Sequence, residues 1–347
     1  MGWPHADGRI PAMRSVHLIV PELLPSEYLS AGVVEGLSLP VLERMLARGR
    51  RETREVVSLE ALLCESFFEP GYVGTPVTAI SAAFDGLGQG CWLRADPGHM
   101  QLLRREVVLQ PAGDVTADEA ARLCAALNEH FAGQGMAFAA PHPRRWYLRL
   151  DAQPDVLTVP MSRAVGCDVG GLLPSGAEGA RWQQSFNEMQ MLLFSHPVNA
   201  AREERGVLPV NCLWLWGNGE AAVRSPGRYA EVVSDDDLAG MFASAAGTRF
   251  VGWAGRWRAD GEGEQLLVLT GLRESAQRND PDAWRAALQE FETGCLQPLW
   301  QALRRGGISR VQIDAPGVGG MRRIRLTRAD AWAFWRRPRR LAEYAMV

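Results

Sequence analysis

The part of the sequence that decides the fold is a short run, a long helix and a second short run near the C-terminus. Residues 265–270 read QLLVLT, residues 280–305 read DPDAWRAALQEFETGCLQPLWQALRR, and residues 308–313 read ISRVQI. The short runs are rich in aliphatic residues, as in buried strands, whereas the long run repeats apolar residues at helical spacing behind an aspartate cap. Gly306-Gly307 ends the helix. Strand, helix and strand in this order predict parallel strands joined by a crossover helix.

The same alternation appears in the first part of the chain and before this stretch. Residues 16–20 read VHLIV, a short buried strand, and a helix follows that ends at Gly49. Residues 234–237 read SDDD, which we interpret as a helix cap with first-turn acids and, less well, as a cation site. We therefore predict an α/β fold with a mainly parallel sheet and helices on both faces.

The middle of the chain has a different pattern. Strand-like runs recur at residues 91–94, 107–109, 146–150 and 211–216, and Thr116 and Glu119 form a capping box that opens a helix. We expect a smaller α+β domain inserted into the sheet domain. The predicted segments are a disordered lead-in at residues 1–15, an α/β core at residues 16–85 and 229–347, and the insertion at residues 86–228.

Composition removes several kinds of chemistry. The 347 residues contain no lysine, so all 37 basic residues are arginine, and neither Schiff-base chemistry nor a P-loop lysine is available. There are six histidines and none follows His196. A net charge of −3 gives no electrostatic footprint for nucleic acid. No apolar run suits a membrane span, and six scattered cysteines without a CxxC pair favour a reducing, cytoplasmic setting.

Three groups of residues are candidates for binding. Arg94, Asp96 and His99 stand close together in sequence, where an arginine fork steadied by a carboxylate could hold a carboxylate or phosphate; a structural hydrogen-bond group is the alternative. His196 ends a helix and forms the second group. The alternative to a role in binding is that it satisfies the last carbonyls of that helix. The third group is the C-terminal tail, interpreted as a solvated helix end or as a docking patch for an acidic partner. Its residues are Trp332, Phe334, Trp335, Arg336, Arg337, Arg339 and Arg340.

One longer pattern resembles a known family. Its residues are Glu188, His196-Pro197-Val198-Asn199, Arg202, Gly206, Pro209 and residues 211–219. They resemble the archaeal-type cofactor-independent phosphoglycerate mutases of the alkaline phosphatase superfamily, and residues 39–49, 92–96, 115–128 and 265–314 resemble further segments. A narrower resemblance, carried by Asp96 and the aromatic tail, is to the proteobacterial RpfE-type regulatory proteins. The resemblance implies an alkaline-phosphatase-like α/β fold with an inserted substrate domain.

The chemistry implied by this resemblance needs two divalent metals held by Asp and His, and a Ser or Thr nucleophile. Thr75 stands at the nucleophile position, and Asp314 is the one remnant of the metal set, because Arg273 falls where a metal ligand pair is expected. No histidine is available for the late metal ligands. The substrate-binding residues that the resemblance implies are Arg94, Asp96, His99, His196, Asn199 and Arg202.

We therefore expect a bacterial, cytoplasmic pseudoenzyme without metal or other cofactor. It would bind a phosphorylated or carboxylated metabolite or a regulatory protein partner, but neither nucleic acid nor a membrane. One alternative is an active Mn²⁺- or Mg²⁺-dependent phosphoglycerate mutase or phosphatase with relocated ligands. Another is an interaction adaptor that uses the C-terminal aromatic and arginine residues.

Overall fold

A computed structural model describes residues 14–25, 32–55, 57–69, 76–217, 227–259, 263–317 and 319–345. The chain forms two compact units, Met1–Leu59 with Ser225–Val347, and Glu60–Arg224. Each unit is described by itself. The predicted insertion boundaries at residues 86 and 228 stay a prediction.

The first unit is built on a seven-stranded sheet in the order β2-β12-β11-β1-β10-β8-β9. β1 is parallel to β10 and β11, and β8 is parallel to β10 and β9, whereas β12 and β2 run antiparallel at one edge. The predicted mainly parallel sheet is thus confirmed. Its strands are β1 (Ser15–Ile19), β2 (Arg50–Arg54), β8 (Glu231–Ser234), β9 (Arg249–Gly252), β10 (Glu264–Val268), β11 (Arg310–Gly317) and β12 (Gly320–Thr327).

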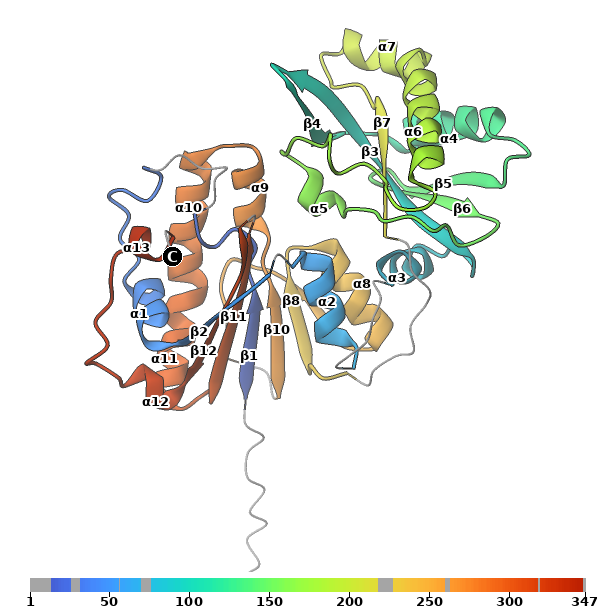
Figure 1. The fold of residues 1–347 in the computed structure, drawn as a ribbon. Coiled ribbons are helices and arrows are strands. Elements are labelled where there is room, and N and C mark those ends of the chain that lie inside the picture. The colour runs from blue at the N-terminus through green and yellow to red at the C-terminus, as the bar shows by residue number, and fades with distance from the viewer. Residues whose placement is uncertain are drawn as a thin grey trace, which may run out of the picture. The chain divides into compact units, whose positions relative to one another are not determined.

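Helices lie on both faces of this sheet (Figure 1). The main apolar core joins α1, α10 and α11 to β1, β11 and β12, with fully buried Leu18, Leu42, Trp284 and Val311. α8 lies on the other side, against β8 and β9. The helices are α1 (Pro40–Arg48), α8 (Asp237–Ala246), α9 (Gly271–Gln277), α10 (Pro281–Phe291), α11 (Gln297–Arg305), α12 (Arg328–Ala331) and α13 (Leu341–Ala345).

One detail of this unit differs from the sequence analysis, and one strand was not predicted there. The helix expected over residues 280–305 is interrupted by a π-helical segment, Glu292–Leu296. This segment turns the buried Glu292 carboxylate toward α1, where it accepts hydrogen bonds from the backbone N–H groups of Val41 at 2.6 Å and Leu42 at 3.0 Å. The run after β11 is a further strand, β12, which extends the sheet with antiparallel pairing.

The second unit holds a five-stranded sheet in the order β4-β3-β6-β5, with β7 paired to β3, all antiparallel. Thr116 and Glu119 form the predicted capping box at the start of α4. The apolar core joins this sheet to α4 and α6 through residues such as Leu123, Trp146 and Met189. The elements are α2 (Leu59–Phe67), α3 (Val77–Phe84), β3 (Cys91–Leu103), β4 (Glu106–Pro111), α4 (Ala117–His130), β5 (Met136–His142), β6 (Arg145–Leu150), α5 (Met161–Ala164), α6 (Gly179–Phe194), α7 (Pro197–Glu204) and β7 (Cys212–Trp216).

No helix in the described part of the chain is both long and apolar enough to cross a bilayer.

Candidate functional site

The carboxyl ends of the parallel strands are the first candidate site, because open α/β sheets bind ligands beyond that edge. Ile19, the last residue of β1, pairs with both Val268 at the end of β10 and Asp314 in β11. Ser234 ends β8 level with Val268. The acids that follow β8, the buried Glu22 that follows β1 and the Asp314 carboxylate are therefore among the groups that this edge offers.

The two acids after β8, Asp235 and Asp236, accept hydrogen bonds from backbone N–H groups. Asp235 accepts hydrogen bonds from the N–H groups of Thr270 at 2.7 Å and Gly271 at 3.2 Å, and its burial raises its pKa. Asp236 caps α8 by accepting from the backbone N–H groups of Leu238 at 2.9 Å and Ala239 at 3.2 Å. The predicted helix cap is confirmed, with Asp236 as the capping residue.

The remaining oxygen of Asp236 faces an arginine from α9. Arg273 Nη2 lies 3.5 Å from Asp236 Oδ2, with both side chains mostly buried. The resemblance placed a metal ligand pair where Arg273 stands. In this unit, the positive charge that faces the Asp236 carboxylate is therefore the guanidinium of Arg273.

Asp314 is the most enclosed acid of the edge, with no exposed surface. Arg323, its cross-strand neighbour on β12, donates from Nε to Oδ1 and from Nη2 to Oδ2, both at 2.7 Å. His17 Nε2 lies 2.8 Å from Oδ2 and Gln312 Nε2 lies 3.2 Å from the same atom. Burial opposes the ionisation of Asp314, but the hydrogen bonds from Arg323 and His17 outweigh it and lower its pKa to about 2.

His17 and Arg323 are site residues that the sequence analysis did not select. Val16 and Leu18 on β1 face the apolar core, so alternation turns His17 to the opposite sheet face, where its Nδ1 lies 2.8 Å from the Tyr229 hydroxyl. A histidine within an otherwise apolar strand was the available signal. The partner strand of Arg323 could not be read from local pattern.

The carboxylates of this edge do not fit a divalent metal. Within the described ranges, no three His, Cys, Asp or Glu side chains gather in a way that could hold one. Both oxygens of Asp314, the expected metal remnant, accept from the guanidinium of Arg323. A dication needs several such donors in its first coordination shell. Thr75, at the expected nucleophile position, lies outside the described residues.

The second unit contains a buried cationic group on β3. Arg94 donates to Asp96 Oδ1 from Nε at 3.1 Å and from Nη2 at 2.6 Å, and Trp216 Nε1 donates to Asp96 Oδ2 at 2.8 Å. The Arg94 guanidinium lies 5.4 Å from the ring centroid of Tyr147 and 5.2 Å from that of Trp216. Among the described residues nothing accepts a hydrogen bond from Arg94 Nη1, so this nitrogen is the one left for a ligand.

The structure separates His99 from this pair and adds other residues to it. β3 continues beyond the predicted end, so Arg94 and Asp96 share one sheet face while His99 turns to the other and contacts the Pro209 carbonyl oxygen at 2.9 Å. Arg94 and Asp96 thus form one hydrogen-bonded pair and His99 is not part of it, while the predicted role of the three in substrate binding stays a prediction. Tyr147 extends the group, because its hydroxyl donates at 2.6 Å to Asp85, which also accepts from Arg145 at 2.7 Å.

The HPVN segment organises the backbone of the second unit. His196 stands between two helices. As expected it follows the end of α6, where its backbone N–H donates to the Leu193 carbonyl oxygen at 3.1 Å, whereas its side chain caps α7, with Nδ1 accepting from the Val198 N–H at 3.2 Å. Asn199 is buried and donates to the carbonyl oxygens of Leu193 at 2.7 Å and Val210 at 2.8 Å, while accepting from the Val210 N–H at 2.8 Å. These contacts fix the start of α7 to the segment that enters β7.

Arg202 completes this arrangement from α7 and is fully buried. It donates to the carbonyl oxygens of Leu208 at 3.0 Å, Gly113 at 2.7 Å and Asp114 at 3.3 Å. Its ion pair with Glu119, at 2.8 Å, reaches the capping box of α4. Arg202 and Asn199 therefore hold the unit together, and their predicted role in substrate binding stays a prediction.

Comparison with known proteins agrees with the resemblance found in the sequence. No protein-family model matches the chain. The 2,3-bisphosphoglycerate-independent phosphoglycerate mutase of Methanothrix thermoacetophila is 26% identical over 219 residues, 56% of this chain and 55% of that protein. The 2,3-bisphosphoglycerate-independent phosphoglycerate mutase 2 of Methanothermobacter thermautotrophicus is 34% identical over 110 residues, 31% of this chain and 27% of that protein. The chain spans about half the length of the curated relatives it matches.

The fold has a counterpart among solved structures. The PH0037 protein from Pyrococcus horikoshii matches with a TM-score of 0.54 and 12% identity, over 96% of this chain and 93% of that one. The α/β architecture is thus a known fold, and in sequence the chain resembles the cofactor-independent phosphoglycerate mutases of archaea and bacteria at low identity. The narrower resemblance to RpfE-type proteins stays a prediction.

Proposed function

We propose that this protein is a pseudoenzyme related to the cofactor-independent phosphoglycerate mutases, retained to bind a ligand or regulate a partner. The observation that carries the proposal is the pairing of Asp314 with Arg323 and of Asp236 with Arg273. In both pairs an arginine supplies the positive charge that a metal would otherwise bring to a carboxylate. A guanidinium neutralises charge but cannot activate a nucleophile or polarise a phosphoryl oxygen as a dication does.

The ligand of such a protein would be a phosphorylated or carboxylated metabolite held at Arg94. Its guanidinium is oriented by Asp96 and by two aromatic rings, and Nη1 remains directed to no acceptor in the described part of the chain. An arginine fixed in this way recognises an anionic oxygen with little loss of side-chain entropy.

Thermal denaturation with and without 3-phosphoglycerate tests this ligand class. We expect a ligand-dependent rise in the melting temperature of the wild type that is abolished in Arg94→Ala. Because Arg94→Ala also breaks the pair with Asp96, the quantity compared is the ligand-induced rise within each variant. Arg149→Ala, an exposed residue on neighbouring β6, is the matched control and should keep the full rise. Equal rises in Arg94→Ala and wild type, or none in wild type, would contradict the proposal.

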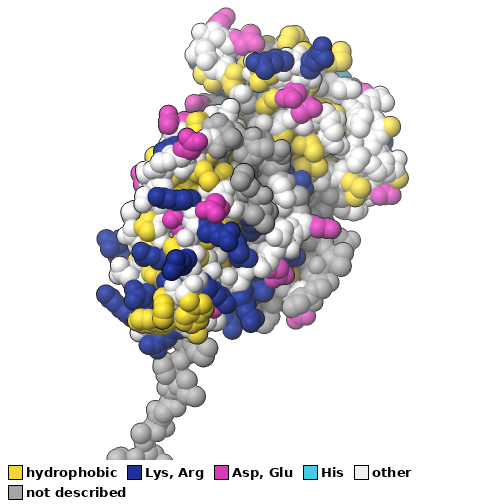
Figure 2. Space-filling view, turned by 60° about the vertical axis from the view of Figure 1, so that its left-hand side comes forward, with side chains coloured by type: hydrophobic (Ala, Val, Ile, Leu, Met, Phe, Trp, Pro, Cys, Tyr) yellow, Lys and Arg dark blue, Asp and Glu magenta, His cyan; other side chains and the backbone are white. Residues whose placement is uncertain are grey.

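A second candidate function, that of an interaction adaptor, is favoured by the C-terminal aromatic residues. Phe334 and Trp335 are 77% and 68% exposed, and Trp332 is 53% exposed beside the Arg304 guanidinium. Dark blue arginine side chains surround a yellow patch at the lower end of the surface in Figure 2. Aromatic anchors bordered by arginines are typical of binding surfaces, and here the charge fits an acidic protein partner.

The adaptor is best tested by point substitution, because deletion of the tail would remove Leu341 and Tyr344 from the core. We expect Phe334→Ser/Trp335→Ser to leave the unfolding free energy within about 0.5 kcal/mol of wild type, since both side chains are exposed. The same variant should lose the acidic partners that wild type retains in crosslinking. Phe84→Ser, which replaces an exposed phenylalanine of the second unit, is the control. An unchanged set of partners would remove the adaptor function.

A further inference from the structure

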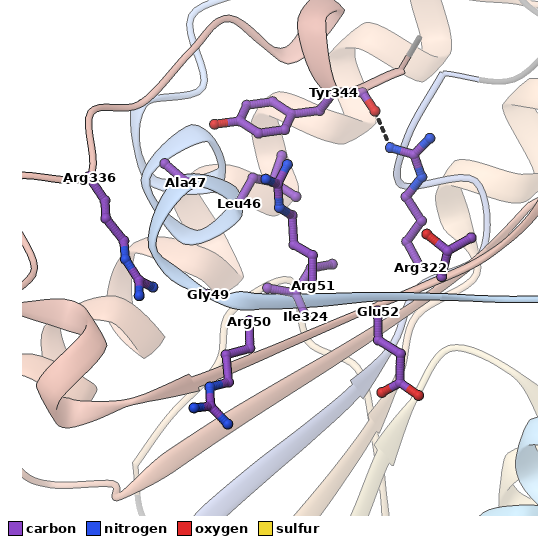
Figure 3. A pocket seen from close by; sticks show the side chains of 11 residues that line it. Leu46, Ala47, Gly49, Arg50, Arg51, Glu52, Arg322, Ile324, Arg336 and Tyr344 are labelled. Carbon is purple, nitrogen blue, oxygen red and sulfur yellow. Dashed lines mark hydrogen bonds between the residues drawn. The ribbon is translucent and has the colours of Figure 1, made fainter. Parts of the chain in front are cut away.

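A hollow of about 500 Å³ lies beside the edge strand β2 of the first unit, away from the strand ends described above. Its lining comes from the end of α1, from β2 and β12, and from the C-terminal tail (Figure 3). Gly49 makes the close approach of α1 to β12 possible, because a Cβ there would lie 2.5 Å from Ile324 Cγ2. The floor of the hollow is therefore fixed by packing.

Four arginines line this hollow: Arg50, Arg51, Arg322 and Arg336. Strand alternation and the register of β2 with β12 place Arg51 on the sheet face of Ile324 and Arg322, while Arg50 lies on the opposite face. In Figure 3 the side chains of Arg50 and Arg51 accordingly leave β2 in opposite directions. The positive charges surround the edge strand instead of meeting at one point.

Within the described residues, carboxylates cancel little of the charge of Arg50, Arg51 and Arg336. Glu52 is the one acid in the lining, and it pairs with Arg325 at 3.0 Å. In the described part of the chain neither Arg50 nor Arg51 forms an ion pair, and Arg336 has Asp330 at 3.7 Å. A hollow of this kind attracts anions, since clustered charge in a concave surface focuses the electrostatic field.

Neutral groups hold several of these arginines in place. Arg322 donates to the backbone carbonyl oxygen of Tyr344, and Arg336 donates to that of Arg48 at 2.6 Å. The Arg51 guanidinium lies 5.4 Å from the Tyr344 ring centroid. Burial, and next the charge of Arg51, lower the pKa of Arg322. The like charges of Arg51 and Arg322 are thus close together and pre-positioned, an arrangement that a bound anion would relieve.

We propose that this hollow is a binding site for a small anion with two or more linked phosphate groups. Guanidinium forks match phosphate oxygens in a bidentate manner, and linked phosphates are needed to reach arginines on both faces of one strand. The volume is in the range of small-molecule sites. The site goes beyond the proposed function, because it shares no residue with Arg94 or with the strand ends.

Calorimetric titration of the full chain at constant ionic strength tests this site, with pyrophosphate and tripolyphosphate as inorganic probes and ADP and ATP as nucleotide probes. We expect at least one probe to bind the wild type, and Arg50→Gln/Arg51→Gln to weaken that binding by about tenfold or more. The two kinds of probe distinguish an inorganic from a nucleotide ligand, and saturation by either supports the site.

Arg310→Gln, an exposed arginine on β11 outside the hollow, is the matched control and should bind the probe within about twofold of wild type. Arg50 and Arg51 are exposed, so the double variant should keep the circular dichroism spectrum and melting temperature of wild type. The proposal is overturned if no probe binds, if the double variant binds as tightly as the control, or if sulfate competes equally at the same ionic strength.

Discussion

Arg202→Ala is expected to lower the unfolding free energy of the second unit by about 3–5 kcal/mol, enough to unfold a unit of ordinary stability. The substitution leaves three carbonyl oxygens, those of Gly113, Asp114 and Leu208, without their buried donor. It also removes from the Glu119 carboxylate its fully buried partner. Buried polar groups without partners carry the full cost of desolvation.

Urea denaturation followed by tryptophan fluorescence measures this loss, and Arg205→Ala is the matched control. Arg205 pairs with the same Glu119 carboxylate, but its side chain is 52% exposed. A half-exposed ion pair is worth about 1 kcal/mol or less. The structural role of Arg202 would be contradicted if both variants lost the same stability.

Asp314→Asn is expected to cost the first unit about 3–5 kcal/mol. The variant removes the Asp314 charge that faces Arg323. The amide that replaces the carboxylate can accept guanidinium hydrogen bonds only at its oxygen, because its nitrogen is a donor. Glu52→Gln, which removes an exposed acid from the same sheet face, should cost about 1 kcal/mol or less. Asp314→Leu/Arg323→Met removes both charges and should recover a large part of the loss. If this double variant is less stable than Asp314→Asn, the loss of stability in Asp314→Asn does not come from breaking the ion pair.

The dependence of stability on pH below about 5 gives a second measure of the contribution of Asp314. Because the folded-state pKa of Asp314 is lowered to about 2, ionised Asp314 stabilises the fold above its unfolded pKa. That contribution, about 2 kcal/mol, is lost as the pH falls from about 4 toward 2. The stability gap between wild type and Asp314→Asn should therefore narrow in acid. A gap that stays constant between about pH 5 and pH 2.5 would contradict this assignment.

Local patterns in the sequence were enough for the parts of the fold that depend on local rules. The capping box at Thr116, the Asp280 cap and the strand at residues 16–20 are each defined by neighbours in sequence. The parallel sheet followed from the order of these elements. The π-helical segment at Glu292 did not, because the hydrogen-bonded contact that accompanies it is with α1, some 250 residues away.

The candidate site was harder to predict for the same reason. The acid Asp314 could be selected from the resemblance, but its partners His17 and Arg323 are brought to it by pairing across three strands. The reverse also occurs: Arg94 and His99 are close in sequence and were considered as one group, but strand alternation places them on opposite faces of the sheet. Side-chain direction and strand partners, not residue type, decide which groups meet.

We propose that arginines have taken the place of the metal centre at the strand ends. The direct test is to equilibrate the purified chain with Mn²⁺, remove free metal, and measure retained metal per chain together with phosphatase and mutase turnover. We predict substoichiometric metal and no turnover above the protein-free control. A stoichiometric bound dication, with turnover that is lost in Thr75→Ala, would contradict the account and establish the active enzyme with relocated ligands.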